Sequence, residues 1–347
     1  MAYHFFTDPE YAGPQPVDIL KFWEKGGYSL RNSPRKKLPE LLFPDSNELI
    51  KPELAKSENS KEIAQFWKQY YKGDDWSFSC SWADVERWLK TGFIIIIKRE
   101  NVIVGTFVCH YLKGVLCGNF NPQAALLDGL VIAPWLRGKG LASFLLAAMD
   151  HIVYLKPELN RSILIWFREH SNRLSAITQN PISILEYSYA KISSFVKHDL
   201  QVEKLHHEIV DGIVKTIFTK SNRDFTLLSS DTSDPDVYWY LVEKSLIGIA
   251  FTHRIATGDY TIWEIVFAAN ITEPFFDNLQ TPIERAAQEL PCSRGLIFGS
   301  NGKSRGNLKN PTSPWLQGTS GFLTTHVYNW MPPNFLSGDI FFPHSCI

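Results

Sequence analysis

The spacing of apolar positions predicts two helices near the start of the chain. Residues 57–71 place large apolar side chains at intervals of three and four, as one face of an amphipathic helix requires: Ile63, Phe66, Trp67 and Tyr70. A second helix is expected after Ser81, a residue type that caps helix N-termini, with Val85 and Trp88 facing inward.

Strand patterns follow the two helices. The run "GFIIIIK" and the β-branched run after it flank a polar break at Arg99–Asn101, which predicts a hairpin. A strand over Leu126–Ile132 and a turn over Ala133–Lys139 come next. The helix expected after this turn has one apolar face: Leu141, Phe144, Leu145, Ala148, Met149 and Ile152. A further strand is predicted over Arg161–Phe167.

The same order of elements recurs in the second half. The segment Lys204–Pro235 is polar and turn-rich, and the run "LLSSDTSDPD" is expected to connect the halves. A hairpin with its turn at Glu243–Ser245, a third strand, a helix, a fourth strand and a last strand over Phe322–Trp330 follow. The pattern predicts an α+β protein with a degenerate structural repeat and two domains, 1–200 and 201–347.

Composition narrows the class of protein. The chain has 347 residues, 44% of them hydrophobic and 14% aromatic, which favours packed globular structure. A net charge of −1 gives no global field for nucleic acid or an anionic membrane. The five cysteines lack metal-site spacing, so we expect free thiols and no metal. No stretch resembles a signal peptide or a membrane span, and we expect a soluble, cytoplasmic monomer.

The turn "LRGKGLA" is the strongest sign of chemistry. Backbone N–H groups in the first turn of a helix lack intrahelical acceptors and bind phosphate, and glycines let the backbone approach it. Arg137 and Lys139 add positive charge. An ordinary turn with solvated charges is the alternative for this motif by itself. A second glycine-rich run, Phe298–Asn307, lacks the spacing of a P-loop and is expected to be a surface loop.

The order hairpin, strand, glycine-rich basic turn and helix resembles the acetyl-CoA-binding motif of the GCN5-related N-acetyltransferase (GNAT) superfamily. Two such halves, of which the second lacks a basic glycine turn, resemble the protein N-myristoyltransferase family. The fold that this resemblance implies is two tandem GNAT-like mixed sheets flanked by helices.

Five short runs carry the second resemblance, in the family's order. "YHFF" followed by "QPV" resembles the family's Tyr-x-Phe-Trp and Gln-Pro-Val segment, and "YYKGDDWSFSCS" its acidic peptide-contacting loop. "DGLVIAPWLRGKGLA" stands where the family has Asn-Phe-Leu-Cys-Val-His-Lys-Lys-Leu-Arg-Ser-Lys-Arg-Val-Ala. "NPISILEYSYAKIS" and "HVYNWMPP" resemble its Tyr-Trp-His and Tyr-Asn-Trp segments.

The resemblance implies a function and its residues. It implies transfer of a fatty acyl group, with myristoyl favoured, from acyl-CoA to the N-terminal glycine amine of a protein or peptide, without a metal or a covalent enzyme intermediate. The terminal carboxylate of Ile347 would accept the amine proton, and the N–H groups of Gly129 and Leu130 would bind the thioester oxyanion. Acyl-CoA would contact Tyr3, Phe5, Phe6, Leu130, Val131, Ile132, Arg137, Gly138, Lys139, Gly140, Leu141 and Ala142. The acceptor would contact Asp74, Asp75, Phe78, Tyr189 and Tyr328.

Departures from the family keep other functions open. The family's Phe at the oxyanion pair is Gly129 here, its terminal Leu-Gln is Cys346-Ile347, and its His aligns with Tyr189. "RGKG" is closer to ordinary acetyltransferases than the family's Arg-Ser-Lys-Arg. A GNAT that uses acetyl-CoA or another short acyl-CoA, and an acyl-CoA-binding protein without turnover, are the two alternatives.

Overall fold

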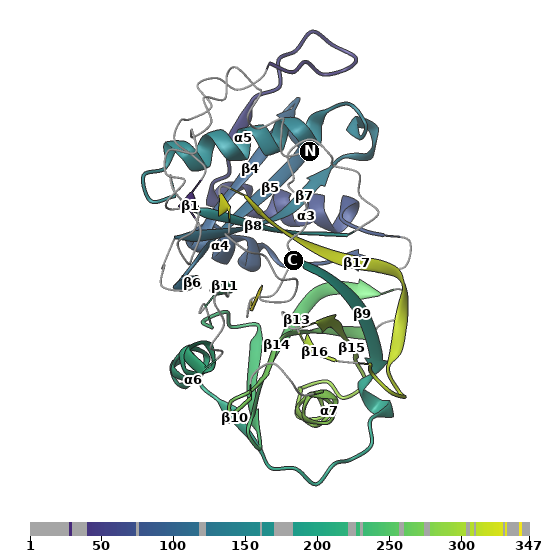
Figure 1. The fold of residues 1–347 in the computed structure, drawn as a ribbon. Helices are drawn as coiled ribbons and strands as arrows, with labels where there is room; N and C mark the ends of the chain where they lie inside the picture. Colours follow the sequence, from purple (N-terminus) through teal and green to yellow (C-terminus); the bar gives the residue numbers. More distant parts are fainter. Residues whose placement is uncertain are drawn as a thin grey trace.

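The computed structural model describes residues 28–29, 40–73, 76–117, 123–159, 162–169, 183–220, 227–229, 232–256, 260–273, 278–302, 306–308, 310–328, 330–331 and 340–341. Within these ranges the chain forms an upper and a lower half, each a mixed sheet with helices on its faces (Figure 1).

The first half contains the elements that the apolar pattern predicts. Its helices are α3 (Ser60–Tyr70), α4 (Trp82–Thr91) and α5 (Leu141–Leu155), and its main strands are β4 (Gly92–Arg99), β5 (Val102–Leu112), β7 (Ala124–Ile132) and β8 (Ile163–Glu169). Ser81 caps α4 by accepting a hydrogen bond from the Asp84 N–H. The β4–β5 turn places Glu100 and Asn101 at positive φ, as the twist of a two-residue hairpin requires.

The second half repeats this order. Its main strands are β12 (Val237–Val242), β13 (Ser245–Ala256), β14 (Tyr260–Asn270) and β15 (Leu296–Gly302), with α7 (Gln280–Ala287) between the last two. In each half three antiparallel strands are followed by a helix and a parallel strand: β7 pairs β8 in parallel, and β14 pairs β15 in parallel. The predicted repeat is therefore present in the fold.

Two long strands join the halves into one sheet. β9 (Ser183–Lys191) pairs β15 on one side and β17 (Leu316–Tyr328) on the other, and β17 pairs β8 of the first half. The path β10-β12-β13-β14-β15-β9-β17-β8-β7-β5-β4-β2 belongs to a 14-stranded sheet that also includes β3 and β16. β3 follows α3 in the chain but pairs β13, so it links the halves as well.

The remaining elements are short, apart from helix α6. They are β1 (Tyr28–Ser29), β2 (Pro52–Leu54), β3 (Trp76–Phe78), β6 (Val115–Cys117), β10 (Val202–Leu205), α6 (His207–Lys220), β11 (Leu227–Ser229), β16 (Gly306–Asn307), β18 (Trp330–Met331), β19 (Ile340–Phe341) and the 3-10 turns Ser57–Asn59, Pro134–Leu136 and Ile192–Ser194.

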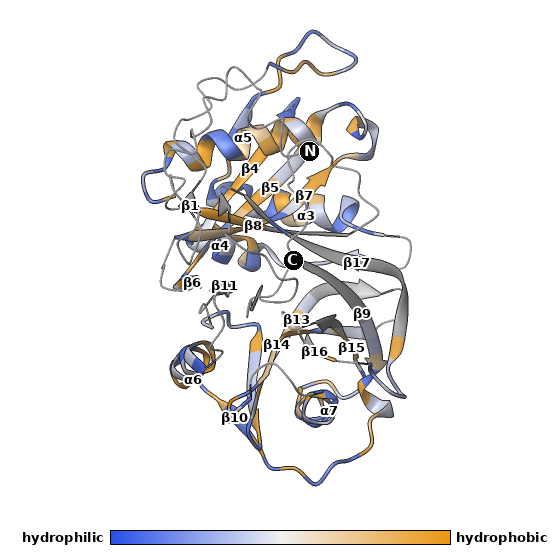
Figure 2. Ribbon diagram, in the orientation of Figure 1, coloured by the Kyte–Doolittle hydropathy of each residue, from blue (hydrophilic) through white to orange (hydrophobic). Residues whose placement is uncertain are grey.

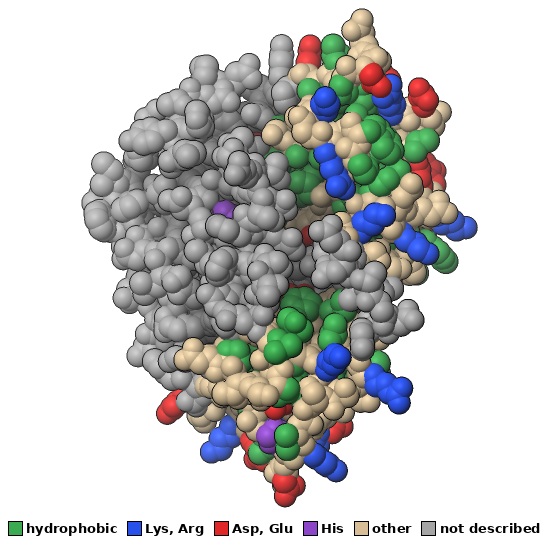
Figure 3. Space-filling view, turned by 90° about the vertical axis from the view of Figure 1, so that its right-hand side faces the viewer, with side chains coloured by type: hydrophobic (Ala, Val, Ile, Leu, Met, Phe, Trp, Pro, Cys, Tyr) green, Lys and Arg blue, Asp and Glu red, His purple; other side chains and the backbone are tan. Residues whose placement is uncertain are grey.

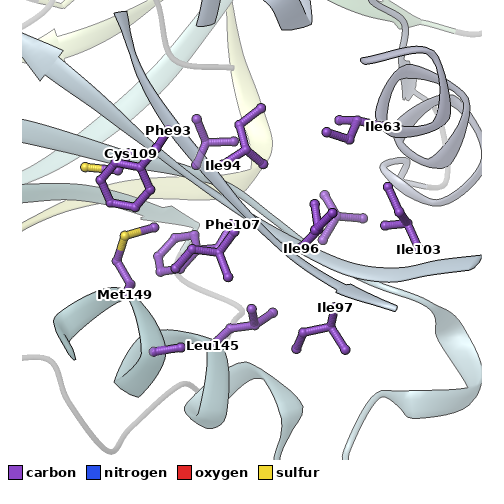
Figure 4. Close-up of a cluster of buried hydrophobic side chains, with 14 of the residues drawn as sticks. Ile63, Phe93, Ile94, Ile96, Ile97, Ile103, Phe107, Cys109, Leu145 and Met149 are labelled. Carbon is purple, nitrogen blue, oxygen red and sulfur yellow. The ribbon is translucent and has the colours of Figure 1, made fainter. Parts of the chain in front are cut away.

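The helices divide the first sheet into two buried faces. Ile94 and Ile96 of β4 lie on the side of Ile63 in α3, and Ile97 lies on the side of Leu145 in α5 (Figure 4). This alternation follows from the two-residue period of a strand and explains why the run of isoleucines is buried on both sides. The strands β4, β5 and β7 are correspondingly hydrophobic along much of their length (Figure 2).

Two predictions about polar segments are wrong. Residues 204–235 were expected to be polar and turn-rich, but α6 occupies 207–220 and buries Val210, Val214 and Ile217 against the second sheet. The run Phe298–Asn307 was expected to be a surface loop, but β15 continues to Gly302 and pairs β16. The spacing of Val210, Val214 and Ile217 would have indicated the helix.

Basic and acidic side chains both occur on the described part of the face in Figure 3, in keeping with the near-zero net charge. Among the helices that the structure describes, none is long and apolar enough to cross a membrane.

Candidate functional site

The strands β7 and β8 separate before either of them ends. Their parallel pairing stops at Leu127 and Trp166, whereas β7 continues to Ile132 and β8 to Glu169. Beyond Leu127, backbone groups of β7 on this side are not used by the β7–β8 ladder. Since backbone N–H and C=O groups are strong hydrogen-bonding groups, this stretch can bind an extended ligand.

A β-bulge at Gly129 shapes the same stretch. The β5–β7 register shifts between Thr106 and Val108, which pair Val131 and Asp128. Gly129 has φ +60, and a Cβ there would lie 2.6 Å from Val108 Cγ2. Positive φ is costly for residues with a side chain, so both conformation and space require glycine.

Buried hydrogen bonds hold the bulge in place. The Trp67 Nε1–H donates to Thr106 Oγ1 at 2.7 Å, and the Thr106 hydroxyl donates to the Gly129 carbonyl at 3.0 Å. Trp67 and Thr106 are fully buried, so each polar atom depends on this chain of bonds. The sequence gives no signal for this arrangement, because it joins three separate elements.

The predicted oxyanion donors lie at the bulge, and one of them has a partner. The Gly129 N–H donates to Asp128 Oδ1 at 2.7 Å. A ligand oxygen could use this N–H only after the Asp128 carboxylate had moved away. Asp128 was not among the residues predicted from the sequence, and its side chain is half-buried. The oxyanion role of Gly129 and Leu130 stays a prediction.

The basic turn adopts the conformation that its glycines permit. Gly138 has φ +72, and Gly140, the N-cap of α5, has φ +84. A Cβ at either position would meet nothing within 4 Å, so backbone conformation, not crowding, selects glycine. The open space around both residues would admit a phosphate to the N–H groups that begin α5.

Arg137 fixes this turn by bonding to the backbone. Its Nε donates to the Ile132 carbonyl at 3.0 Å, and its Nη2 donates to the Tyr70 carbonyl at 3.1 Å. The guanidinium thereby connects the end of β7, the turn and the end of α3. Lys139 is exposed on the other side of Gly138 in the chain. Arg137 thus has its guanidinium bonded to backbone carbonyls, whereas Lys139 has an exposed side chain.

The structure brings most of the predicted acyl-CoA residues together at the end of β7 and the start of α5. Leu130, Ile132 and Ala142 are half-buried, and Val131 and Leu141 are buried. Tyr3, Phe5, Phe6, Asp74, Asp75 and Ile347 lie outside the described residues.

The predicted acceptor residues fall in different environments. Tyr189 of β9 is 40% exposed and lies between Phe298 of β15 and Leu316 of β17 in register. Tyr328 pairs with Leu164 of β8. Phe78 is fully buried against Trp67 and Trp88, with ring centroids 5.7 and 6.3 Å away. Its ring has no exposed surface in this structure, and its predicted contact with the acceptor stays a prediction.

Two described thiols are poor nucleophiles. Burial, together with the smaller effect of the nearby Asp84 carboxylate, raises the pKa of Cys80 to about 12. Burial also raises the pKa of Cys109 well above its usual range. Because the thiolate is the reactive form, neither residue is suited to accept an acyl group near neutral pH.

Comparison with known proteins defines the fold. Residues 61–175 match the model of the Acetyltransferase (GNAT) family. Crystal structures of Saccharomyces cerevisiae N-myristoyltransferase with bound myristoyl-CoA match with TM-scores of 0.58, 0.58 and 0.59 at 11–12% sequence identity. The matches cover 90–94% of this chain and 86–94% of the yeast chains. No curated protein sequence matches. The predicted α+β tandem GNAT fold is confirmed.

Proposed function

We propose that this protein is an acyltransferase that moves a fatty acyl group from acyl-CoA to the N-terminal glycine amine of a protein or peptide. The observation that carries the proposal is the separation of β7 from β8 beside the turn Arg137–Gly140 and the N-terminus of α5. This arrangement offers an extended pantetheine arm the part of β7 that lies outside the β7–β8 pairing, and it offers phosphates a helix N-terminus. The full-length match of fold to yeast N-myristoyltransferase supports a long acyl chain.

The chain's own residues would bind and orient acyl-CoA. The N–H groups after Gly140 and the Lys139 ammonium would bind phosphate oxygens, and β7 would hold the thioester beside Gly129 and Leu130. Acyl-CoA supplies an activated thioester carbonyl, whose oxygen gains negative charge when an amine attacks it. Backbone N–H groups near that oxygen would stabilise this charge. The terminal carboxylate of Ile347 would accept a proton from the amine.

A GNAT that uses acetyl-CoA or another short acyl-CoA is the second candidate. It is favoured by the match of residues 61–175 to the GNAT family model and by the turn Arg-Gly-Lys-Gly. The two candidates share the phosphate site and differ in the space beyond the thioester. An acyl-CoA-binding protein without turnover is distinguished from both by the absence of product.

Acylation of a peptide with a free N-terminal glycine, followed by mass spectrometry, tests the proposed function. With equal concentrations of myristoyl-CoA and acetyl-CoA, we expect the tetradecanoyl product, and none from the same peptide blocked at its amine. Acetyl product alone would establish the second candidate. Appending one residue after Ile347 should abolish transfer, and unchanged transfer would contradict the role of the terminal carboxylate.

A further inference from the structure

The chain between α6 and β12 contacts the first half before it enters the second sheet. In this stretch β11 pairs β6 of the first half on one side and β19 near the C-terminus on the other, as a small sheet of order β19-β11-β6. We call residues 227–229 and 232–236 the clasp. In Figure 1, β6 and β11 lie on the left between the upper and lower halves, whereas β9 and β17 lie on the right.

Polar side-chain contacts hold the clasp to the first half. The Arg87 Nη2 of α4 donates to Asp236 Oδ2 at 2.5 Å and lies 3.3 Å from Asp84 Oδ1. The Lys113 Nζ donates to Ser233 Oγ at 3.0 Å in an exposed contact. The side chains of Arg87 and Asp236 keep 33% and 26% of their surface exposed. Solvent-exposed ion pairs contribute little net free energy, so these contacts can break and re-form at low cost.

The other side of the clasp is fixed to the second half. The His207 Nδ1 bonds the carbonyl of Thr232, and the buried Thr232 hydroxyl donates to the Asp211 carboxylate, so α6 holds the clasp at this residue. The Asp236 carbonyl accepts the N–H of Phe251 in β13 at 2.9 Å. The clasp therefore moves with the second half when its contacts to the first half break.

The ladders that join the two halves differ in length. The ladders β8–β17, β17–β9 and β9–β15 each contain six residue pairs. By comparison, β6–β11 contains three pairs, and so does β3–β13. Short ladders with exposed contacts open at a lower free energy than long, buried ones. If the halves part, they would therefore part at the clasp and turn about β9 and β17.

The clasp also carries the strand that leads to the C-terminus. The strand β19 pairs Leu227 and Leu228 in parallel, and its last residue, Phe341, lies six residues before Ile347. When β11 leaves β6, β19 leaves the first half with it. Closing the clasp brings β19 back beside β11 and β6, and so brings the end of the chain towards the first half.

We propose that the clasp opens and closes once in each catalytic cycle. It opens to admit the acceptor and to release the acylated product, and it closes to bring the C-terminal strand to the first half before the acyl group is transferred. The inference rests on the proposed function, because it assigns the opening to the exchange of a protein or peptide acceptor. The acyl-CoA site at β7 and α5 lies within the first half and does not depend on the opening.

A disulfide across β6 and β11 tests whether the clasp must open. Val115 and Ser229 are direct antiparallel partners, and such partners have Cα atoms about 4.5–5.5 Å apart, within the reach of a disulfide. In the oxidised Val115→Cys/Ser229→Cys variant we expect kcat/KM for a glycine peptide to fall at least about tenfold, and dithiothreitol to restore it. The affinity for myristoyl-CoA, measured by calorimetric titration, should stay within about twofold of the native value.

A disulfide inside the second half is the matched control. Glu203 and Leu241 are direct antiparallel partners in β10 and β12, and neither strand pairs with the first half. The oxidised Glu203→Cys/Leu241→Cys variant should transfer the acyl group as fast as its reduced form. Full activity of the oxidised Val115→Cys/Ser229→Cys variant would overturn the inference and leave the proposed function standing.

Reversing the charge of Arg87 tests whether the clasp must close. In Arg87→Glu a carboxylate faces Asp236, so the closed state should be less populated and kcat should fall about tenfold, with the affinity for myristoyl-CoA unchanged. Adding Asp236→Arg to this variant restores an opposite pair and should return kcat to within about twofold of the native value. A loss that the second substitution does not repair would contradict a role for this ion pair in closing the clasp.

Amide hydrogen exchange of the native protein measures the opening without any substrate. We expect the amides of β11 to exchange at least about 100-fold faster than the paired amides of β9 and β17, and Arg87→Glu to increase the rate in β11 further. Equal protection of β11 and β9 would overturn the inference. A native protein that acylates no amine would instead overturn the proposed function and, with it, the part of the clasp in acceptor exchange.

Discussion

Gly129 shows how one residue determines the shape of the candidate site. Its φ of +60 creates the bulge that places two backbone N–H groups and Asp128 where β7 leaves β8. The sequence predicted a strand over this region and, through resemblance, an oxyanion role for Gly129. It could not predict the Asp128 contact or the bonds from Thr106, because side-chain partners across elements leave no periodic pattern.

Gly129→Ala should lower the free energy of unfolding by about 3 kcal/mol. The new methyl group would lie 2.6 Å from Val108 Cγ2, and alanine would be strained at positive φ. Urea denaturation followed by tryptophan fluorescence measures the change. Gly105→Ala is the matched control, since its Cβ would meet Leu145 Cδ1 at 3.4 Å without positive φ, and it should cost less than about 1 kcal/mol. Equal losses in both variants would contradict the strain argument.

At the scale of elements, only some of the features that form the turn between β7 and α5 can be recognised in the sequence. Its glycines and basic residues are visible in the sequence and predicted an anion site. The two bonds from Arg137 to the Ile132 and Tyr70 carbonyls are not visible there, and the second of them joins the turn to the end of α3, 67 residues away. They indicate that Arg137 shapes the turn.

The substitution Arg137→Lys distinguishes the role of Arg137 in holding the turn through hydrogen bonds from the role of its positive charge. Lysine keeps the positive charge but cannot make both carbonyl bonds in the geometry of the guanidinium. We expect Arg137→Lys and Arg137→Ala to weaken acyl-CoA binding by similar factors, about tenfold each, in calorimetric titrations. Native affinity in the lysine variant would show that Arg137 acts through its charge alone.

Helix α6 was not predicted, although its sequence has a helical period. Its buried residues follow the helical period, but the polar residues between them and the turn-rich run after them suggested a segment without a helix. Periodicity was thus the better guide than local composition. By contrast, the hairpin turns at Glu100–Asn101 and at Glu243 were predictable to within one residue, because strand patterns flank a short polar break.

At the scale of the whole molecule, the long strands β9 and β17 join the two repeats into one sheet. The sequence predicted the order of elements and the repeat, but not the partners of β9 and β17, because hydrophobic periods carry no information on which strands pair. β17 lies between β8 and β9, so the first half obtains an edge partner from the last third of the chain. The boundary at residues 200 and 201 stays a prediction.

A fragment of residues 1–200 tests how strongly the halves depend on each other. Without β17, the edge of β8 would be exposed, and β9 would lose both of its partners. We therefore expect the fragment alone to aggregate, since unpaired strand edges promote association. Size-exclusion chromatography after co-expression with residues 201–347 should recover a soluble complex. A monomeric, cooperatively folded 1–200 fragment would show that the first domain is independent.

The central claim, that acyl-CoA binds where β7 leaves β8 at the start of α5, is tested most directly by calorimetric titration of the native protein and of Lys139→Glu with myristoyl-CoA. We predict binding of one molecule per chain to the native protein. The Lys139→Glu variant places a carboxylate beside the phosphates, so its affinity for myristoyl-CoA should be at least tenfold weaker. Added salt should reduce this difference in affinity between the two proteins. Acetyl-CoA should bind more weakly than myristoyl-CoA, because it buries less apolar surface. No binding of either thioester, or equal affinity in the native and Lys139→Glu proteins, would contradict the claim.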